Sequence, residues 1–208
     1  MARIEPFEKY TKIYEDWFFK NKYAYESEVA AIKALLPQGK GIEIGVGTGR
    51  FAYPLGIKIG IEPSEKMAEV AKERGIEVIK GTAEKIPFKD EEFDYAIMVT
   101  TICFVDNPKD AFSEIYRILK PNGAIIIGFV DRESPLGKEY EINKNKNLFY
   151  KHATFYTTKE IVFLLKKTGF KNFEFTQTIF SRLKDINTIE SIEKGYGKGS
   201  FVVIKGNK

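Results

Sequence analysis

Three glycines on alternate positions mark a place where a ligand could meet the main chain. Gly45, Gly47 and Gly49 follow a short apolar run, and a second apolar run, Ile57–Ile61, ends on the carboxylate of Glu62. Glycine has no Cβ, so a ligand can approach the backbone closely at such positions. A carboxylate at the end of a strand can bind both ribose hydroxyls, and ligands of α/β sheets bind outside the carboxyl ends of the strands. This stretch therefore predicts a site for a nucleoside-like ligand.

Two nucleotide-binding patterns compete for this turn. A dinucleotide site requires Gly-x-Gly-x-x-Gly. Counted from Gly45, the last glycine of that pattern falls on Arg50, and an acid, Glu43, stands two residues before the first glycine. The turn therefore fails the dinucleotide pattern and needs another interpretation.

Hydrophobic periodicity and turn residues predict the elements that must position the glycine turn. Strands and helices alternate through the first two thirds of the chain, which requires a parallel sheet with right-handed crossovers. A capping box formed by Thr157 and Glu160 opens a late helix that ends at Gly169. The predicted strands cover residues 40–44, 57–61, 77–80, 94–100, 124–130, 173–179 and 201–205. The predicted helices cover 7–36 with a break near Asn21, then 64–74, a helix from Pro108, and 157–169.

The first crossover helix after the glycine turn must be very short, because Pro54 and Gly56 interrupt it. Such a helix normally covers one face of the sheet, so another element must do so. The N-terminal helical segment is unusually aromatic, with Tyr14 and Trp17 among its rings. It has two compatible interpretations: it packs on the sheet, or it forms a lid over the ligand.

The amino-acid composition restricts the kind of protein that this chain can be. The 208 residues, 43% hydrophobic and 30% charged, suit one globular domain. The net charge of +4 is too balanced to indicate nucleic acid. We expect no secretory signal and no membrane span. The single cysteine, Cys103, indicates a reducing cytoplasm, and abundant Lys and Glu with scarce Gln favour a thermophile.

The segments from residue 40 to 128 resemble, in the right order, the S-adenosylmethionine-dependent methyltransferases of the Rossmann-like class I, small-molecule type (methyltransferase domain 11-like). The resemblance rests on four segments, and a looser match continues over Tyr156–Phe170. The four are Glu43–Gly49 with Glu62 after the next strand, Gly81–Phe88, Phe93–Val99 with Phe104–Pro108, and Ile115–Gly123.

The resemblance implies a seven-stranded, mostly parallel sheet with the last strand antiparallel, helices on both faces, and S-adenosyl-L-methionine as cofactor. Glu62 would hold the ribose, residues 82–84 would line the adenine, and Thr100 would lie under the cofactor. Glu43 would orient the glycine loop or reach the methionine amine, or could be a surface acid, and Glu84 could equally be a solvated residue. The residues expected to bind the cofactor are Tyr14, Trp17, Glu43, Gly45, Gly47, Gly49, Glu62, Pro63, Thr82, Ala83, Glu84 and Thr100.

The sequence restricts the identity of the methyl acceptor only in part. The exit of the fourth strand, Thr100–Phe104, lacks the Asn/Asp-Pro-Pro-Tyr/Phe of enzymes that methylate base amines, and Cys103 follows Ile102 where a cysteine nucleophile would follow proline. Asp106 and Asn107 are interpreted as a turn and helix cap, so we expect no metal. The only histidine, His152, is either a structural residue or a candidate general base.

We expect one methyltransferase domain with a helical lid at 1–37, a cofactor-binding core at 38–130 and an acceptor-side half at 131–208 with an insert at 131–155. The expected activity is methyl transfer to a small molecule at an N, O or C atom by a monomer or homodimer. A non-catalytic binding protein on the same scaffold and a protein or nucleic-acid methyltransferase stay open. The last would need a basic stripe, whereas four lysines of the insert region are interpreted as a solvated face: Lys138, Lys144, Lys146 and Lys151.

Overall fold

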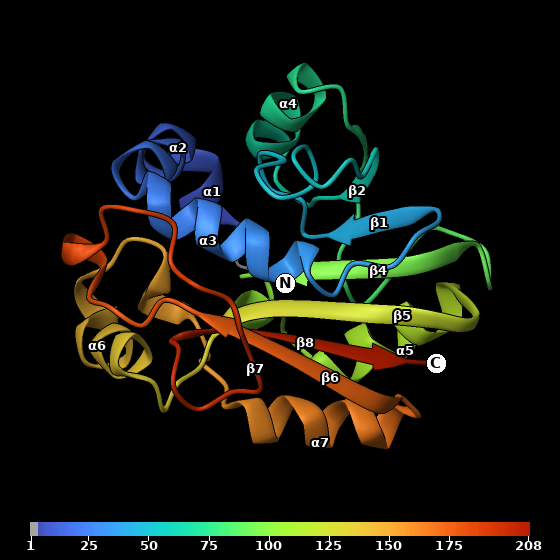
Figure 1. The fold of residues 1–208 in the computed structure, drawn as a ribbon. Coiled ribbons are helices and arrows are strands. Elements are labelled where there is room, and N and C mark those ends of the chain that lie inside the picture. The colour runs from blue at the N-terminus through green and yellow to red at the C-terminus, as the bar shows by residue number, and fades with distance from the viewer. Residues whose placement is uncertain (1–3) are drawn as a thin grey trace.

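The computed structural model describes residues 4–208, whose strands form one sheet in the order β3-β2-β1-β4-β5-β8-β6-β7 (Figure 1). Strands β3, β2, β1, β4 and β5 pair in parallel. The strands are β1 (Gly41–Ile44), β2 (Ile59–Ile61), β3 (Glu77–Ile79), β4 (Phe93–Val99), β5 (Leu119–Val130), β6 (Lys171–Thr178), β7 (Glu193–Lys194) and β8 (Phe201–Asn207). The chain winds outward from β1 through β2 to β3, then returns to place β4 on the other side of β1. Ligands of open α/β sheets bind at such a reversal.

The last strand, β8, is antiparallel to both neighbours and lies between β5 and β6. The predicted arrangement of seven strands with the last one antiparallel is confirmed. The two residues of β7 pair with β6 and add an eighth strand at the edge. Strand β5 begins at Leu119 rather than at residue 124, because Leu119 still pairs with Phe93 of β4.

Helices cover both faces of the sheet. They are α1 (Glu5–Lys9), α2 (Thr11–Lys20), α3 (Lys22–Lys33), α4 (Glu65–Glu73), α5 (Pro108–Ile118), α6 (Pro135–Asn143) and α7 (Thr158–Thr168). The helix caps predicted from the sequence are present in the structure. Ser64 Oγ accepts from the Met67 N–H at 3.3 Å and caps α4, and Thr157 and Glu160 form the capping box of α7. The break expected near Asn21 separates α2 from α3.

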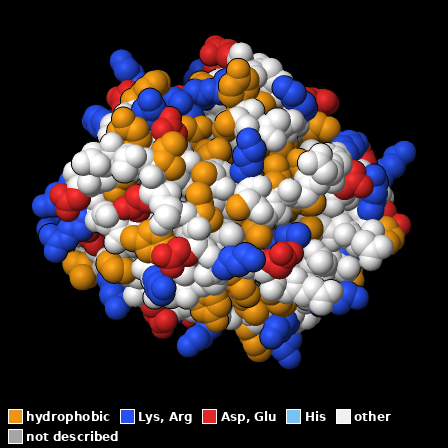
Figure 2. All heavy atoms as spheres, viewed as in Figure 1, with side chains coloured by type: hydrophobic (Ala, Val, Ile, Leu, Met, Phe, Trp, Pro, Cys, Tyr) orange, Lys and Arg blue, Asp and Glu red, His pale blue; other side chains and the backbone are white. Residues whose placement is uncertain are grey.

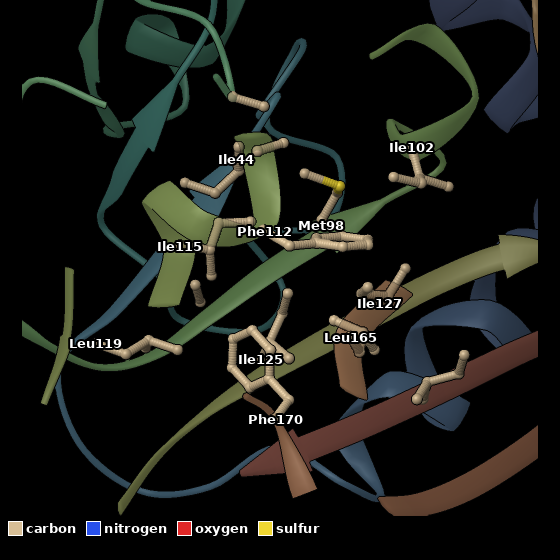
Figure 3. Close-up of a cluster of buried hydrophobic side chains, with 14 of the residues drawn as sticks. Ile44, Met98, Ile102, Phe112, Ile115, Leu119, Ile125, Ile127, Leu165 and Phe170 are labelled. Atoms are coloured by element: carbon tan, nitrogen blue, oxygen red, sulfur yellow. The ribbon is translucent and has the colours of Figure 1, made fainter. Parts of the chain in front are cut away.

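One face of the sheet packs against α5 and α7. Figure 3 shows Phe112 and Ile115 of α5 and Leu165 of α7 directed toward the strand residues Met98 and Ile127, and all five are buried. This core fixes β4 and β5, so that the end of β4 has a defined position.

The opposite face is covered by the N-terminal helices, as predicted from the missing crossover helix. Residues 50–56 form only turns. Helix α3 crosses in front of the sheet in Figure 1, and its Ala31 and Ile32 share a buried cluster with Ile126 of β5 and Val203 of β8. The aromatic segment thus replaces the usual helix on this face.

The insert 131–155 is more regular than expected from its polar, aperiodic sequence. It contains α6 and two short 3-10 helices, Lys144–Lys146 and Tyr150–His152. Helix α6 begins with Pro135, and Ser134 Oγ accepts from the Gly137 N–H at 3.0 Å. Serine followed by proline is a helix-start signal in its own right, and it could have identified this helix from the sequence.

No helix between residues 4 and 208 combines the length and apolar character needed to cross a membrane. On the face drawn in Figure 2, basic and acidic side chains are interspersed with small hydrophobic areas.

Candidate functional site

The turn after β1 depends on glycine at two positions. Gly45 has φ +72°, and a Cβ there would lie 2.4 Å from Thr101 Cγ2. Its N–H and that of Val46 both donate to the Ile61 carbonyl at 2.9 Å, which joins the end of β1 to the end of β2. Gly47 has φ +55°, and a Cβ there would have only Met67 Cε and Tyr14 Oη nearby, each at 3.5 Å. A Cβ at Gly47 would therefore make only ordinary van der Waals contacts, and the glycine is required here chiefly by its positive φ.

Glu62 holds this turn in place from the end of β2. Its Oε2 accepts from the Gly47 N–H at 2.8 Å and its Oε1 from the Ser64 N–H at 2.9 Å. Burial raises the pKa of Glu62 to about 7, although these two backbone hydrogen bonds act in the opposite direction. Each carboxylate oxygen has two lone pairs, so both can still accept from a ligand hydroxyl.

Glu43 lies within β1, almost completely buried, and its Oε2 has no hydrogen-bond partner among residues 4–208. Burial, with the nearby charge of Glu62, raises the pKa of Glu43 well above its ordinary value. An unsatisfied buried acceptor is costly, and a donor on a ligand in the adjacent turn would relieve that cost. An amine is such a donor.

A cleft of about 100 Å³ opens at the carboxyl ends of β1, β2 and β4. Most of the residues predicted for the cofactor line it: Tyr14, Gly45, Gly47, Glu62, Pro63, Thr82, Ala83, Glu84 and Thr100. Ile4, Phe7 and Phe104, which were not predicted, complete the wall on the side of α1 and the loop after β4.

The remaining predicted residues lie elsewhere. Trp17 lines a second cavity, Glu43 lies behind the turn, and Gly49 faces Ile76, whose Cδ1 a Cβ would approach to 2.4 Å. Glu84 has a structural partner as well as a place on the wall: its Oε1 accepts from the backbone N–H of Asp106 at 2.9 Å. It thereby ties the segment after β3 to the loop after β4.

The second cavity measures about 440 Å³ and adjoins the cleft. The two share four lining residues: Phe7, Tyr14, Thr100 and Phe104. Thr100 stands at the end of β4 with φ +52°, a conformation that is uncommon outside glycine and often accompanies functional sites. The volume of the second cavity falls in the range of small-molecule sites.

Aromatic side chains from the N-terminal helices, the loop after β4 and the insert 131–155 close this second cavity. Phe7 lies with its ring centroid 5.0 Å from that of Phe104 and 5.3 Å from that of Phe149. The Tyr140 and Tyr150 centroids are 4.9 Å apart. Such rings exclude water from the space beside Thr100. The rings of the insert 131–155 are far in sequence from the N-terminal rings that they face.

An ion-pair network fastens α2 to the glycine turn. The Glu15 carboxylate binds Arg50 Nη2 at 2.6 Å and Arg74 Nη2 at 2.5 Å, and Arg74 also donates to the Thr48 carbonyl. Burial alone would raise the pKa of Glu15, but the hydrogen bonds from both arginines outweigh it and leave that pKa below its ordinary value. Arg50, which distinguishes this turn from a dinucleotide motif, thus holds the helix that carries Tyr14.

His152 is exposed in the 3-10 helix Tyr150–His152 and lines neither cavity. The structure therefore does not bring the candidate base to the site. Sequence analysis also missed Glu28, which is 4% exposed and lines the second cavity. The sequence pattern could have identified Glu28, because it is a charged residue on the same helical face as Ala24, Ala31 and Ile32. The buried face of a helix normally carries hydrophobic residues.

Comparison with known proteins matches this geometry to a family. A family described as "Methyltransferase domain" matches residues 42–127. A Thermotoga maritima protein, described as a SAM-dependent methyltransferase and possible histamine N-methyltransferase, is 56% identical, with a TM-score of 0.97 over 99% of both chains. The chain belongs to the S-adenosylmethionine-dependent methyltransferases. Its cofactor is therefore S-adenosyl-L-methionine.

Other relatives differ in how much of their own length is shared with this chain. An uncharacterized protein of Methanocaldococcus jannaschii is 49% identical over 97% of this chain and 98% of its own length. Phosphoethanolamine N-methyltransferase 2 of Caenorhabditis elegans is 31% identical over 70% of this chain but only 34% of its own length. The proteins of Thermotoga maritima and Methanocaldococcus jannaschii thus match this methyltransferase along nearly its whole length.

Proposed function

We propose that this methyltransferase transfers a methyl group to a small molecule bound in the aromatic cavity. The observation that carries the proposal is the wall shared by the two cavities, where Tyr14 and Thr100 face both. A cofactor in the cleft and an acceptor in the aromatic cavity would then meet at the end of β4.

The residues of the cleft suit S-adenosyl-L-methionine in their chemistry. In the cleft, Glu62 offers free lone pairs for ribose hydroxyls, and Gly47 carries no side chain that would obstruct a ligand. Glu43 does not line the cleft, but its Oε2 is an unsatisfied acceptor behind the turn that would suit the methionine amine. Thr82 and Ala83 would flank the adenine. When bound, the cofactor supplies an activated methyl group on its sulfonium.

The chain's own contribution is to position the acceptor and exclude water. Alignment of two reactants can lower a barrier by about 7–11 kcal/mol at most. Phe7, Phe104 and Phe149 enclose the space next to Thr100, and the network around Glu15 holds α2 above it. We therefore assign residues 4–37 of the predicted lid as a lid and the insert 131–155 as the acceptor-side wall; residues 1–3 of the predicted lid lie outside the described residues.

A small acceptor suits the cavity better than a macromolecule does. Aromatic rings line a volume of about 440 Å³, and no single-signed stripe is present on the described surface drawn in Figure 2. A nucleic-acid substrate would require a basic face. The similarity to proteins of Thermotoga maritima and Methanocaldococcus jannaschii supports a thermophilic source, and the lone Cys103 supports the cytoplasm.

Calorimetric titration with S-adenosylmethionine, S-adenosylhomocysteine and NAD tests the proposal. We expect both adenosyl ligands to bind and NAD to fail. Binding without methyl transfer to a broad panel of small amines, alcohols, thiols and carbon acids would instead support a non-catalytic binding protein. NAD binding alone would refute the assignment of the cleft.

A further inference from the structure

One carboxylate lies in the aromatic cavity without a protein partner. Glu28 is on the buried face of α3 and is 4% exposed, and it lines the cavity. Among residues 4–208, no hydrogen bond or ion pair to its carboxylate is found. The adjacent Ser27, by contrast, accepts from the Glu190 N–H at 2.9 Å. Glu28 is thus a largely buried side chain that lines the cavity and has no protein partner for its carboxyl group among the described residues.

The groups around Glu28 come from four elements and are nearly all aromatic. Tyr14 of α2, Tyr25 of α3, Tyr140 of α6 and Tyr150 of the 3-10 helix lie within electrostatic range of its charge. Burial raises the pKa of each of these phenols, so each stays neutral.

Within the lining of the cavity, Glu28 is the one carboxylate among described residues and Lys146 the one cation. Lys146 is exposed and forms no ion pair with Glu28. The inner part of the cavity therefore combines an unpaired carboxylate with ring faces.

Such a carboxylate is costly unless it is paired with a cation. Burial raises the pKa of Glu28 to about 8, so it is mostly protonated at neutral pH. A ligand cation would supply the missing partner, and aromatic ring faces attract the same charge because their quadrupoles are negative there. Among small-molecule acceptors, the one that carries a positive charge and a latent nucleophile is an amine.

We propose that the methyl acceptor is an amine that enters as an ammonium ion, is paired with the Glu28 carboxylate and packs against the aromatic rings of the cavity. This inference rests on the proposed function. As the ammonium binds, Glu28 releases its own proton to solvent and becomes a carboxylate. An N–H bond of the ammonium then breaks, its proton passes to a Glu28 carboxylate oxygen, and the electron pair stays on nitrogen. The resulting neutral amine has the free lone pair that methyl transfer requires, and the proton later leaves Glu28 to solvent.

The test uses phenethylamine and its neutral counterpart 2-phenylethanol, titrated calorimetrically into the full chain saturated with S-adenosylhomocysteine. We expect phenethylamine to bind at least about tenfold more tightly than the alcohol. Glu28→Gln should weaken amine binding by about 10–100-fold and leave binding of the alcohol and of S-adenosylhomocysteine unchanged. The matched control is Glu26→Gln, on the same helix but paired at the surface with Lys22 at 3.8 Å, which should change neither.

A second readout is the proton balance, which a merely structural Glu28 would not move. Pairing with an ammonium lowers the pKa of Glu28, so at pH 7 the wild type should release most of one proton per bound amine. Titrations in two buffers of different ionisation enthalpy measure this, and Glu28→Gln should release none.

Equal binding of amine and alcohol, or unchanged amine binding and proton release in Glu28→Gln, would overturn the inference. Failure of the adenosyl ligands to bind is a separate result and would refute the proposed function instead. The variant should fold, because at neutral pH it replaces an unpaired, mostly protonated carboxyl group by a neutral amide of similar size, and a thermal melt close to that of the wild type verifies this.

Discussion

Replacing Glu15 by glutamine should loosen the helix that covers the cofactor cleft. Glu15 accepts from Arg50 at 3.2 and 2.6 Å and from Arg74 at 3.4 and 2.5 Å. A glutamine has one acceptor oxygen and an NH₂ group that would face a guanidinium. Two half-buried arginines would then lose their shared counter-charge.

The burial of the Glu15, Arg50 and Arg74 side chains determines how much unfolding free energy the Glu15→Gln variant loses. Glu15, Arg50 and Arg74 are 15%, 15% and 23% exposed. Exposed pairs contribute about 0–1 kcal/mol, whereas removal of one partner of a buried pair costs about 3–5 kcal/mol. Between these limits we expect the free energy of unfolding to fall by about 2–3 kcal/mol, which in a chain of this size lowers the Tm by roughly 5–10 °C.

Urea denaturation at pH 7 measures the loss, with Glu69→Gln as matched control. Glu69 pairs with Lys66 on α4, and these side chains are 63% and 60% exposed, so the same chemical change should cost less than about 0.5 kcal/mol. Equal unfolding free energies for Glu15→Gln and Glu69→Gln would refute the reasoning.

The pH dependence supplies an independent check. The pKa of Glu15 is lowered in the folded state, so its ionised form stabilises the fold above the unfolded pKa and this contribution is lost as pH falls through the folded value. The difference in unfolding free energy between the wild type and Glu15→Gln should have its full value above about pH 5 and should shrink below about pH 4. A difference that does not vary with pH would show that the loss is not electrostatic.

Two further substitutions test the site. Glu62→Gln should weaken S-adenosylhomocysteine binding by about 10–100-fold in calorimetry. One of the two carboxylate oxygens that accept from the backbone and from the ribose hydroxyls is then replaced by an NH₂ donor. An affinity within about threefold of the wild type would contradict that role. His152→Ala should leave kcat for a confirmed acceptor unchanged, because His152 is exposed outside both cavities; a tenfold loss would return it to the chemistry.

Local signals in the sequence were sufficient for the scaffold of the cofactor site. The glycine turn and the acid after the second strand are close in sequence, and the capping box spans only Thr157 to Glu160. These features depend on backbone conformation and hydrogen bonds between near neighbours, which residue type largely dictates. The alternation of strands and helices fixed the sheet for the same reason.

The second cavity, which we propose holds the acceptor, was decided by tertiary structure. Tyr140 and Tyr150 meet Glu28 across more than a hundred residues of chain, and Glu15 meets Arg74 across 59. No local pattern encodes such contacts, because they depend on how whole elements pack on the sheet. The sequence by itself predicted a site for a nucleoside-like cofactor at the glycine turn. Only the packing of α3 on β5, β6 and β8, with the insert 131–155 beside it, placed Glu28 in the second cavity as a largely buried carboxyl group without a protein partner.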